Sequence, residues 1–352
     1  MERTEVVEPD GRAGTGTAGA ERILDRAGWA ATRLALGALR YSIPASANRL
    51  PYMLGGFTFL GLVVLALTGV WLDQLYNPDP LAAHASVVYT VTRAPLGAWV
   101  RALHYWAACV VLVSVVLHLV HVFWRRSYVA PREVTWWSGV LLLVLVGALT
   151  FTGTVLRADQ EGGEALAHAV AAAELLGPLG ALLSPDFSPS TSLLARIHNA
   201  HVSLLPLLLG GTIALHFWLI RHLGINAPAS GRAVFAEHVR RLLGYGLIGV
   251  AGLCLVAALL PPALGHRAVE GVEVTKPFWP FLWIYTLENT IGLWGMIVGP
   301  AVLLGFLIAV PLLDRGAERP AWLTALAAAL LVALLGALAY GFVAPQMQHI
   351  GM

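Results

Sequence analysis

The chain has 352 residues, of which 58% are hydrophobic and only 12% are charged, and its mean hydropathy is +0.73. This composition excludes an ordinary soluble domain and predicts an all-α, polytopic membrane protein. The formal net charge of +2 provides no strong field for nucleic acid. Cys109 and Cys254 both lie in apolar runs, so we expect small buried side chains and neither a disulfide framework nor a zinc site.

The first 40 residues contain no candidate membrane span. Residues 1–20 mix acids, glycines and threonines without an apolar core, which predicts a disordered tail and not a signal peptide. Residues 21–40 place apolar side chains near one face and arginines elsewhere, so we expect an amphipathic helix on the membrane surface. A solvated helix packed on a soluble partner is the alternative. Pro44 and Pro51 then break the chain before the first span.

Seven apolar runs follow, each near the ~20 residues that a helix needs to cross a bilayer. They lie at about 54–72, 100–124, 137–156, 201–221, 243–262, 289–313 and 321–343. A linker of different composition at 225–238 separates the fourth run from the fifth. We therefore expect three parts, namely a tail with a surface helix, a four-helix bundle and a three-helix domain, at 1–40, 41–226 and 227–352.

Basic residues predict the orientation of these helices. Most of the 22 Lys and Arg residues fall on one side of the membrane if the N-terminus is cytoplasmic. Lys276 is the only lysine among them, which is typical of GC-rich coding and favours a bacterial cell membrane. In this orientation the second and fourth spans both run from outside to inside, so we expect them to be parallel.

The second and fourth spans each carry two histidines, which indicate function because ionisable groups are costly within a bilayer. His104 and His118 are fourteen positions apart, so they share a helix face to within about 40° and are separated by about 21 Å along the axis. His201 and His216 are fifteen positions apart, which gives about 60° and 22 Å. Imidazole is a standard axial ligand of haem iron. The pattern predicts one macrocycle between His104 and His201. A second would lie between His118 and His216.

Two alternatives remain open for these histidines. Each imidazole can be satisfied by backbone or polar neighbours without any cofactor. His198 can replace His201 as a ligand, because it lies eighteen positions before His216 and returns to the same helix face. Eighteen residues of helix, however, rise about 27 Å along the axis, which is more than the rise of about 21 Å from His104 to His118. We favour His201 because its distance from the membrane centre matches that of His104.

Glycines in the first and third spans leave room for a close neighbour. They are Gly55, Gly56, Gly61, Gly69, Gly139, Gly147 and Gly153. A macrocycle edge is one candidate neighbour, and plain helix packing is the other. The connection from Arg157 to Arg196 is long, and its Ala-rich stretch at 163–177 predicts a helix. Long connections are often functional, so this one is a candidate cap for a cofactor site.

Recognisable motifs surround these positions. They are IPASAN and PYMLGGFTFLGLVVLALTG in the first span, RALH and a later LH in the second, APREVTWWSGV before the third, and RIHNAHVSLLP with HFWLIRHLGINAP in the fourth. These motifs resemble those of the cytochrome b family of quinol-oxidising complexes, and most closely its cytochrome b6 branch followed by a subunit-IV-like extension. The similarity covers about 40–345 and is strongest over 44–228.

The resemblance implies two non-covalent b-type haems, quinone as substrate, and a homodimer in the lipid bilayer with an iron–sulfur protein and a cytochrome-type subunit as partners. In the family four histidines ligate the haems, which implies this role for His104, His118, His201 and His216. Arg221 matches a basic residue near the inner quinone site of the b6 branch. Arg101 and His121 are candidates for contacts with haem propionates. Met53 stands where the b6 branch has a cysteine for an extra haem, so no covalent haem is expected.

The chain departs from the family at the outer quinol site. The family's PEWY motif appears as PFWP, and Phe278 cannot accept the quinol proton that the motif's Glu accepts in the family. The family's LPW is here Leu156-Arg157-Ala158. The quinone-site candidates at the outer face are Pro277, Phe278, Trp279 and Glu288. Glu288 begins an apolar span and is the first choice for the missing acid, ahead of Asp159, Glu161, Glu270 and Glu273. At the inner face the candidates are Arg221, His222 and Arg40, although Arg40 is better explained as a membrane anchor.

The sequence therefore predicts a dihaem cytochrome b subunit that carries electrons across the membrane in a quinone oxidoreductase of the bc/b6f type. The altered PFWP motif leaves a second interpretation open, a conduit without electron bifurcation between an outer dehydrogenase or carrier and an inner quinone site. A ferric or oxygen reductase is disfavoured because no Gly-rich dinucleotide fingerprint is present. A transporter or scaffold is disfavoured because the two halves differ in helix number.

Overall fold

The computed structural model describes residue 33, residues 36–228 and residues 230–350. The described chain is predominantly α-helical, so the predicted all-α class is confirmed. Seven of the described helices are long and apolar enough to cross a membrane, and they correspond to the seven predicted spans. The expected N-terminal tail lies outside the described residues. Of the expected surface helix at 21–40, only residues 33 and 36–40 are described.

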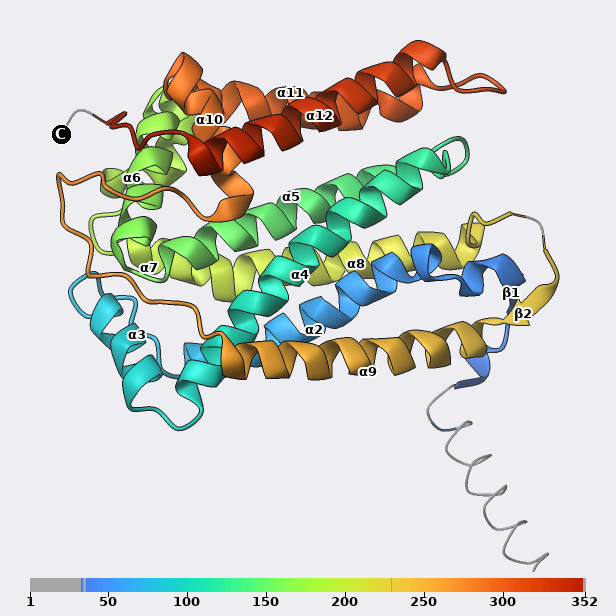
Figure 1. Ribbon diagram of the computed structural model, residues 1–352, viewed down its shortest axis with the longest axis horizontal. Coiled ribbons are helices and arrows are strands. Elements are labelled where there is room, and N and C mark those ends of the chain that lie inside the picture. Colours follow the sequence, from blue (N-terminus) through green and yellow to red (C-terminus); the bar gives the residue numbers. More distant parts are fainter. Residues whose placement is uncertain (1–32, 34–35, 229, 351–352) are drawn as a thin grey trace, which may run out of the picture. The chain divides into compact units, whose positions relative to one another are not determined.

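Figure 1 shows the order of the helices along the chain. The membrane-length helices are α2 (Leu54–Asp73), α4 (Gly97–Trp124), α5 (Glu133–Val155), α8 (Leu205–Leu223), α9 (Phe235–Leu259), α11 (Trp294–Leu313) and α12 (Ala321–Val343). α7 (Leu193–Asn199) and the π-helical turn η6 (Ala200–Leu204) run directly into α8. Shorter helices lie in the connections: α3 (Ala83–Thr92), α6 (Gln160–Glu174) and α10 (Leu282–Ile291). Short 3-10 turns are η1 (Leu36–Leu39), η2 (Ala45–Asn48), η3 (Leu50–Met53), η4 (Gly177–Leu183), η5 (Pro185–Phe187) and η7 (Trp279–Phe281).

The chain divides into two compact units. The smaller unit combines residues up to Asn48 with Ala227–Arg241, and the larger unit combines Arg49–Asn226 with Leu242–Met352. One edge of the smaller unit coincides with the boundary expected after residue 226. The division into three parts expected from the sequence stays a prediction.

A two-stranded sheet organises the smaller unit. β1 (Ser42–Pro44) pairs antiparallel with β2 (Arg232–Val234), and Ile43 lies opposite Ala233. The sequence pattern does not predict this sheet, because strands of three residues are too short to show an alternating hydrophobic pattern. Its effect is to join two segments that are almost 200 positions apart in the sequence.

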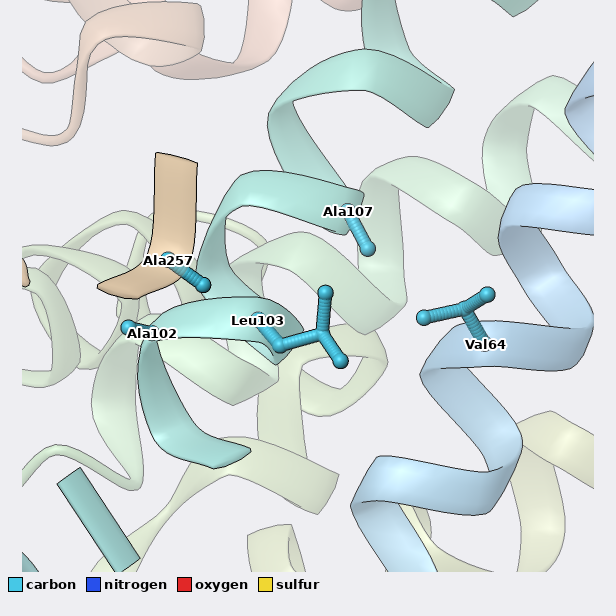
Figure 2. Packing of buried hydrophobic residues seen from close by; sticks show 5 residues of the cluster. All are labelled: Val64, Ala102, Leu103, Ala107 and Ala257. Atoms are coloured by element: carbon cyan, nitrogen blue, oxygen red, sulfur yellow. The ribbon is translucent and has the colours of Figure 1, made fainter. Parts of the chain in front are cut away.

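In the larger unit α2 lies along α4, and α5 lies along α8 (Figure 1). Small and branched apolar side chains fill the space between these helices. Figure 2 shows one such cluster, in which Val64 of α2 faces Leu103 and Ala107 of α4, while Ala257 of α9 packs near Ala102. Interdigitated packing of this kind determines the relative heights of the helices, and therefore the heights of the polar side chains they carry.

The sixth span begins later than the sequence predicts. Gly292 has a φ angle of +68° and ends α10, and α11 then begins at Trp294. Glycine adopts this left-handed conformation at little cost because it has no Cβ. Hydropathy alone could not detect the break, because apolar residues lie on both sides of it. Glu288 consequently lies in α10 and not at the start of the span.

A buried carboxylate ties the connection between α4 and α5 to the end of α11. Asp314 is buried and accepts hydrogen bonds from the guanidinium of Arg126 at 2.6 Å and from the hydroxyl of Tyr128 at 2.7 Å. The pKa of Tyr128 is raised to about 12, mainly by burial and to a smaller extent by the hydrogen bond to Asp314. The phenol therefore remains a hydrogen-bond donor at neutral pH.

We expect Asp314→Ala to lower the free energy of unfolding by about 3 kcal/mol, because it leaves the charge of Arg126 without its partner. This is the lower end of the range for buried pairs, since Arg126 is partly exposed. Glu237→Ala is the control, because it removes an exposed pair with Arg241 and should cost at most about 1 kcal/mol. Unfolding in mixed micelles, followed by circular dichroism, measures both values. Equal losses of unfolding free energy in the two variants would contradict a stabilising role for the buried carboxylate of Asp314.

Candidate functional site

The four intramembrane histidines lie on two helical segments of the larger unit. His104 and His118 belong to α4, while His201 lies in η6 and His216 in α8. His104 and His201 line one cavity and lie within electrostatic reach of each other. His118 and His216 are also within electrostatic reach of each other. The fold thus brings the four side chains together in the two pairs that their spacing predicts.

Hydroxyl groups hold the Nδ1 atoms of three of these imidazoles. The pairs, each 2.8 Å apart, are His104 with Thr68, His201 with Thr152, and His216 with Ser138. Each hydroxyl donates its own hydrogen to a carbonyl about one turn earlier in its helix, so its oxygen is left to accept from the imidazole. The proton therefore lies on Nδ1, and Nε2 keeps its lone pair. This is the tautomer of a histidine that binds a metal through Nε2.

A glycine lies against each of the four imidazole rings. A Cβ at the glycine would come within 3.1–3.5 Å of the ring in the pairs Gly55 with His118, Gly69 with His104, Gly139 with His216, and Gly153 with His201. The rings therefore rest almost directly on the backbones of α2 and α5, and a larger side chain would displace them. Among the other glycines singled out, Gly56 and Gly61 pack against Leu242 and Val111, so plain helix packing explains them.

The spacing of these glycines in the sequence is a signal for their position against the imidazoles. Gly55 and Gly69 are fourteen positions apart, and so are Gly139 and Gly153. The interval equals the one between His104 and His118. Three of the four glycines directly follow the hydroxyl residue that contacts the same ring, which gives a repeated Ser/Thr-Gly pair.

A π-helical turn adjusts the spacing on the second histidine segment. η6 spans Ala200–Leu204 and contains His201. Pro206 follows it and has no N–H to donate to the carbonyl four residues earlier, which favours a local departure from α-helical geometry. A π-helical turn absorbs one extra residue. The fifteen positions from His201 to His216 therefore behave like the fourteen on α4, and the angular mismatch of about 60° is reduced.

His198 has a different environment from His201. Its Nε2 atom lies 2.8 Å from a carboxylate oxygen of Asp73, to which it donates a hydrogen bond. Its ring stacks on Tyr76 with the centroids 5.2 Å apart. Because Nε2 is occupied by the hydrogen bond, His198 is a poorer ligand than His201, whose Nε2 is free of a hydrogen-bonding role.

A cavity of about 410 Å³, here called the His104 cavity, lies among α2, α4, α5 and α8. Its walls are mostly apolar and include Gly69 and Gly153, while Arg101 and Arg157 contribute positive charge. Two bare imidazole nitrogens, apolar walls and basic groups are what an iron porphyrin with anionic propionates requires. At the other histidine pair, the Nε2 atom of His121 is buried without a hydrogen-bond partner. The residues present therefore fit haem.

A second cavity, of about 620 Å³, lies beside the first and is called the Phe278 cavity. Its lining residues include Arg101, Tyr105, Arg157, Glu161, Pro277, Phe278 and Trp279. Phe278 also lines the His104 cavity, so this ring separates the two spaces. The PFWP stretch thus lies next to the pair of His104 and His201, where a family quinol site is expected.

A buried ion-pair network forms one wall of the Phe278 cavity. The guanidinium of Arg157 donates to Asp159 at 2.5 Å and to Glu161 at 2.7 Å. The other carboxylate oxygen of Glu161, Oε1, is buried and has no hydrogen-bond partner. Burial raises the pKa of Glu161 above the usual range of a carboxyl, although the charge of Arg157 opposes the shift. Glu161 is therefore a carboxyl with one oxygen available to a ligand in this cavity.

The remaining candidates lie elsewhere. The carboxylate of Glu288 is 3.6 Å from the imidazole of His168 and is not among the residues that line either cavity. Glu273 lies in the same cluster, and Glu270 is exposed. Arg221 is exposed at the end of α8. Of the five acids considered, Glu161 has the clearest access to the PFWP stretch.

Comparison with known proteins places these observations in a family. The family model described as cytochrome b/b6/petB matches residues 40–224. Cytochrome b6 of Heliobacterium mobile is 35% identical over 192 residues, which cover 53% of this chain and 90% of the relative. The menaquinol:cytochrome c reductase cytochrome b subunit of Geobacillus thermodenitrificans is 37% identical over 185 residues, covering 50% of this chain and 81% of the relative.

A solved structure extends the comparison beyond the matched half. A chain of a hyperthermophilic respiratory Complex III aligns with a TM-score of 0.70 over 87% of both chains, at 20% sequence identity. At that identity the likeness concerns the fold alone. Because the family model ends at residue 224, a match over 87% of the chain includes part of the C-terminal helices as well. With more than half of its length matched by the family model, this chain belongs to the cytochrome b/b6 family.

Proposed function

We propose that the chain is a dihaem cytochrome b that transfers electrons across a membrane as a subunit of a bc/b6f-type quinol oxidoreductase. The observation that carries this proposal is the arrangement of the four imidazoles in two pairs, three of which are held by a hydroxyl with Nδ1 protonated and Nε2 bare. Haem b supplies reversible one-electron redox chemistry when bound. The protein supplies ligands, an apolar cavity, and glycines that let each ring lie against the neighbouring backbone.

The proposed ligands of one haem are His104 and His201, and those of the other are His118 and His216. Ligation on both sides leaves no open coordination position, which favours electron transfer over oxygen binding. We propose Arg101 and His121 as groups that contact propionates. The partly exposed guanidinium of Arg101 is also hydrogen-bonded to the carbonyl of Pro262 at 2.9 Å, which orients it at the edge of both cavities.

Quinol is proposed to bind in the Phe278 cavity, against Phe278 and Trp279. The aromatic and proline side chains provide an apolar surface for a quinol ring. Glu161 is proposed to take the role of the missing motif carboxylate, because Oε1 is free to accept the quinol proton while Oε2 stays bonded to Arg157. Menaquinol, the substrate in the name of the Geobacillus relative, is the first quinol to test. The inner quinone site at Arg221 remains a prediction.

The presence of Phe278 at the position of the family's Glu also favours one alternative function. In this alternative the chain is a conduit that passes electrons between an outer carrier and an inner quinone site without oxidising quinol at the outer face. Quinol:cytochrome c reductase activity of the purified complex separates the two functions. We expect activity that an inhibitor of the outer site abolishes. Activity that is insensitive to such an inhibitor would favour the conduit. An iron–sulfur protein, a cytochrome-type subunit and a second copy of the chain are the proposed partners in a bacterial cell membrane, with the N-terminus in the cytoplasm.

The hydroxyl contacts provide a test of the ligand assignment. We expect Thr152→Val to weaken haem retention at the His201 site about 10- to 100-fold, because the imidazole loses the group that orients it and holds its tautomer. Thr212→Val is the matched control, since Thr212 is half-buried on α8 and its hydroxyl bonds to the carbonyl of Leu208 in its own helix. Haem content per chain after prolonged washing in detergent measures the effect. Equal retention in both variants would count against the ligand set.

A further inference from the structure

A cluster of histidines and carboxylates lies outside the proposed haem and quinol sites. His168 lies in α6, Glu273 in the connection from α9 to α10, and Glu288 in α10, while His349 lies in the segment after α12. All four belong to the larger unit. The ligand atoms of His168, Glu273 and His349 lie within 4.8 Å of one another. Four separate segments therefore converge on one small polar centre.

The hydrogen bonding of His168 leaves its Nε2 atom in an unusual position. Nδ1 lies 2.8 Å from the backbone carbonyl of Glu164, which can only accept, so Nδ1 carries a proton. Nε2 faces a carboxylate oxygen of Glu273 at 3.0 Å and one of Glu288 at 3.6 Å. If the imidazole were neutral, the lone pair of Nε2 would face lone pairs of both carboxylate oxygens, and these would repel one another. The arrangement is stable only if a cation, either a proton or a metal ion, occupies the centre.

Two further observations favour a metal ion. The side chain of Glu288 is only 5% exposed, yet its Oε1 atom, which points at His168, has no hydrogen-bond partner. The carboxylates of Glu273 and Glu288 form ion pairs only with histidines among the described residues, and no Lys or Arg bridge neutralises them. A proton on His168 balances only one of the two buried carboxylates, so the other needs a second proton, whereas a single divalent cation balances both.

Three separations between donor atoms are close to those expected around a tetrahedral ion. Ligands at about 2.0–2.1 Å from a tetrahedral zinc ion are about 3.3–3.4 Å from one another. The observed separations are 3.0 Å from His168 Nε2 to Glu273 Oε1, 3.2 Å from His349 Nδ1 to the same oxygen, and 3.6 Å from His168 Nε2 to Glu288 Oε1. Two imidazoles with carboxylates suit zinc, whereas calcium and magnesium prefer oxygen alone.

We propose that this centre binds one Zn²⁺ ion through four side chains: His168, Glu273, Glu288 and His349. The Nδ1–H of His168 is held by the carbonyl of Glu164, as is usual for a metal-binding histidine. The second oxygen of Glu273 accepts from the backbone N–H of His349 at 2.9 Å, which orients the carboxylate and holds the C-terminal segment. The ion ties that segment and the connection before Pro277 to α6. The site uses none of the proposed haem ligands.

Zinc titration of the purified full-length protein, after treatment with a chelator, tests the proposal. We expect one Zn²⁺ per chain, with binding weakened at least tenfold in His168→Ala and in Glu288→Gln. The second variant preserves side-chain size and guards against misfolding of the first. His222→Ala is the control, because His222 is exposed on α8 and lies 2.8 Å from the carbonyl of Trp218. Circular dichroism confirms the fold of each variant.

X-ray absorption at the zinc edge gives a second readout that does not depend on substitutions. We expect imidazole nitrogen and carboxylate oxygen at about 2.0–2.2 Å, with no sulfur. The proposal is overturned if the protein takes up no stoichiometric zinc, or if both His168→Ala and Glu288→Gln bind it as the unchanged protein does. A purely oxygen coordination shell would overturn it as well. In those cases the centre is a protonated hydrogen-bond network.

Discussion

His201→Ala is expected to reduce the haem content from two per chain to one, whereas His198→Ala leaves both haems bound. The two histidines are three positions apart, but only His201 has its Nδ1 held by a hydroxyl and its Nε2 free. His198 instead donates from Nε2 to Asp73. Under the proposed assignment, His201→Ala removes a ligand of the haem iron, whereas His198→Ala removes none.

Haem quantitation by extraction, together with a reduced-minus-oxidised spectrum, measures this result. The same experiment on His104→Ala should remove the same haem as His201→Ala, because the proposal places these two imidazoles on one iron. A double variant of both positions should therefore lose no more haem than either single variant. Loss of haem in His198→Ala with retention in His201→Ala would reverse the assignment.

Glu161→Gln is expected to lower quinol oxidation by about 10²-fold, the smaller end of what a positioned general base contributes. The amide keeps the size of the side chain and can still accept from Arg157, but it cannot take up a proton. The pH profile provides a sharper test. Burial raises the pKa of Glu161, so the carboxyl is protonated, and unable to act as a base, below that raised pKa.

Activity of the unchanged protein should therefore fall as the pH drops through a value above the ordinary carboxyl pKa of about 4.3. Glu161→Gln should lack this acidic limb. Glu174→Gln is the matched control, because Glu174 is on the same helix but exposed. An unchanged rate and profile in Glu161→Gln would exclude the carboxyl from proton transfer and would support the conduit without outer quinol oxidation.

The spans and the histidine pairing were accessible from the sequence because both depend on local periodicity. A helix repeats every 3.6 residues, so the interval from His104 to His118 determines that they share a face wherever the helix packs. The break at Gly292 was missed, since backbone conformation at a glycine leaves no trace in hydropathy. The π-helical turn was missed for a related reason, because Pro206 permits it but does not require it.

Only the fold could show which of the five acids lies beside the proposed quinol site. The sequence favoured Glu288 by its position at the start of an apolar run, but α10 turns that side chain towards His168. Glu161 gave no sequence signal beyond its place in a long connection. It lies by the Phe278 cavity because α6 packs beside α5, and Arg157 then holds it there.

The sequence by itself determined the membrane class, the seven spans, the family and the histidine intervals, because apolar runs and helical periods are properties of neighbouring residues. The tertiary structure decided which imidazole each hydroxyl and glycine meets, and it alone decided which carboxylates gather at His168. Those contacts join positions such as Glu273 and His349, which are 76 positions apart in the sequence with the two membrane-length helices α11 and α12 between them. Only the packing of helices brings such side chains together, since nothing in the local pattern encodes their partners.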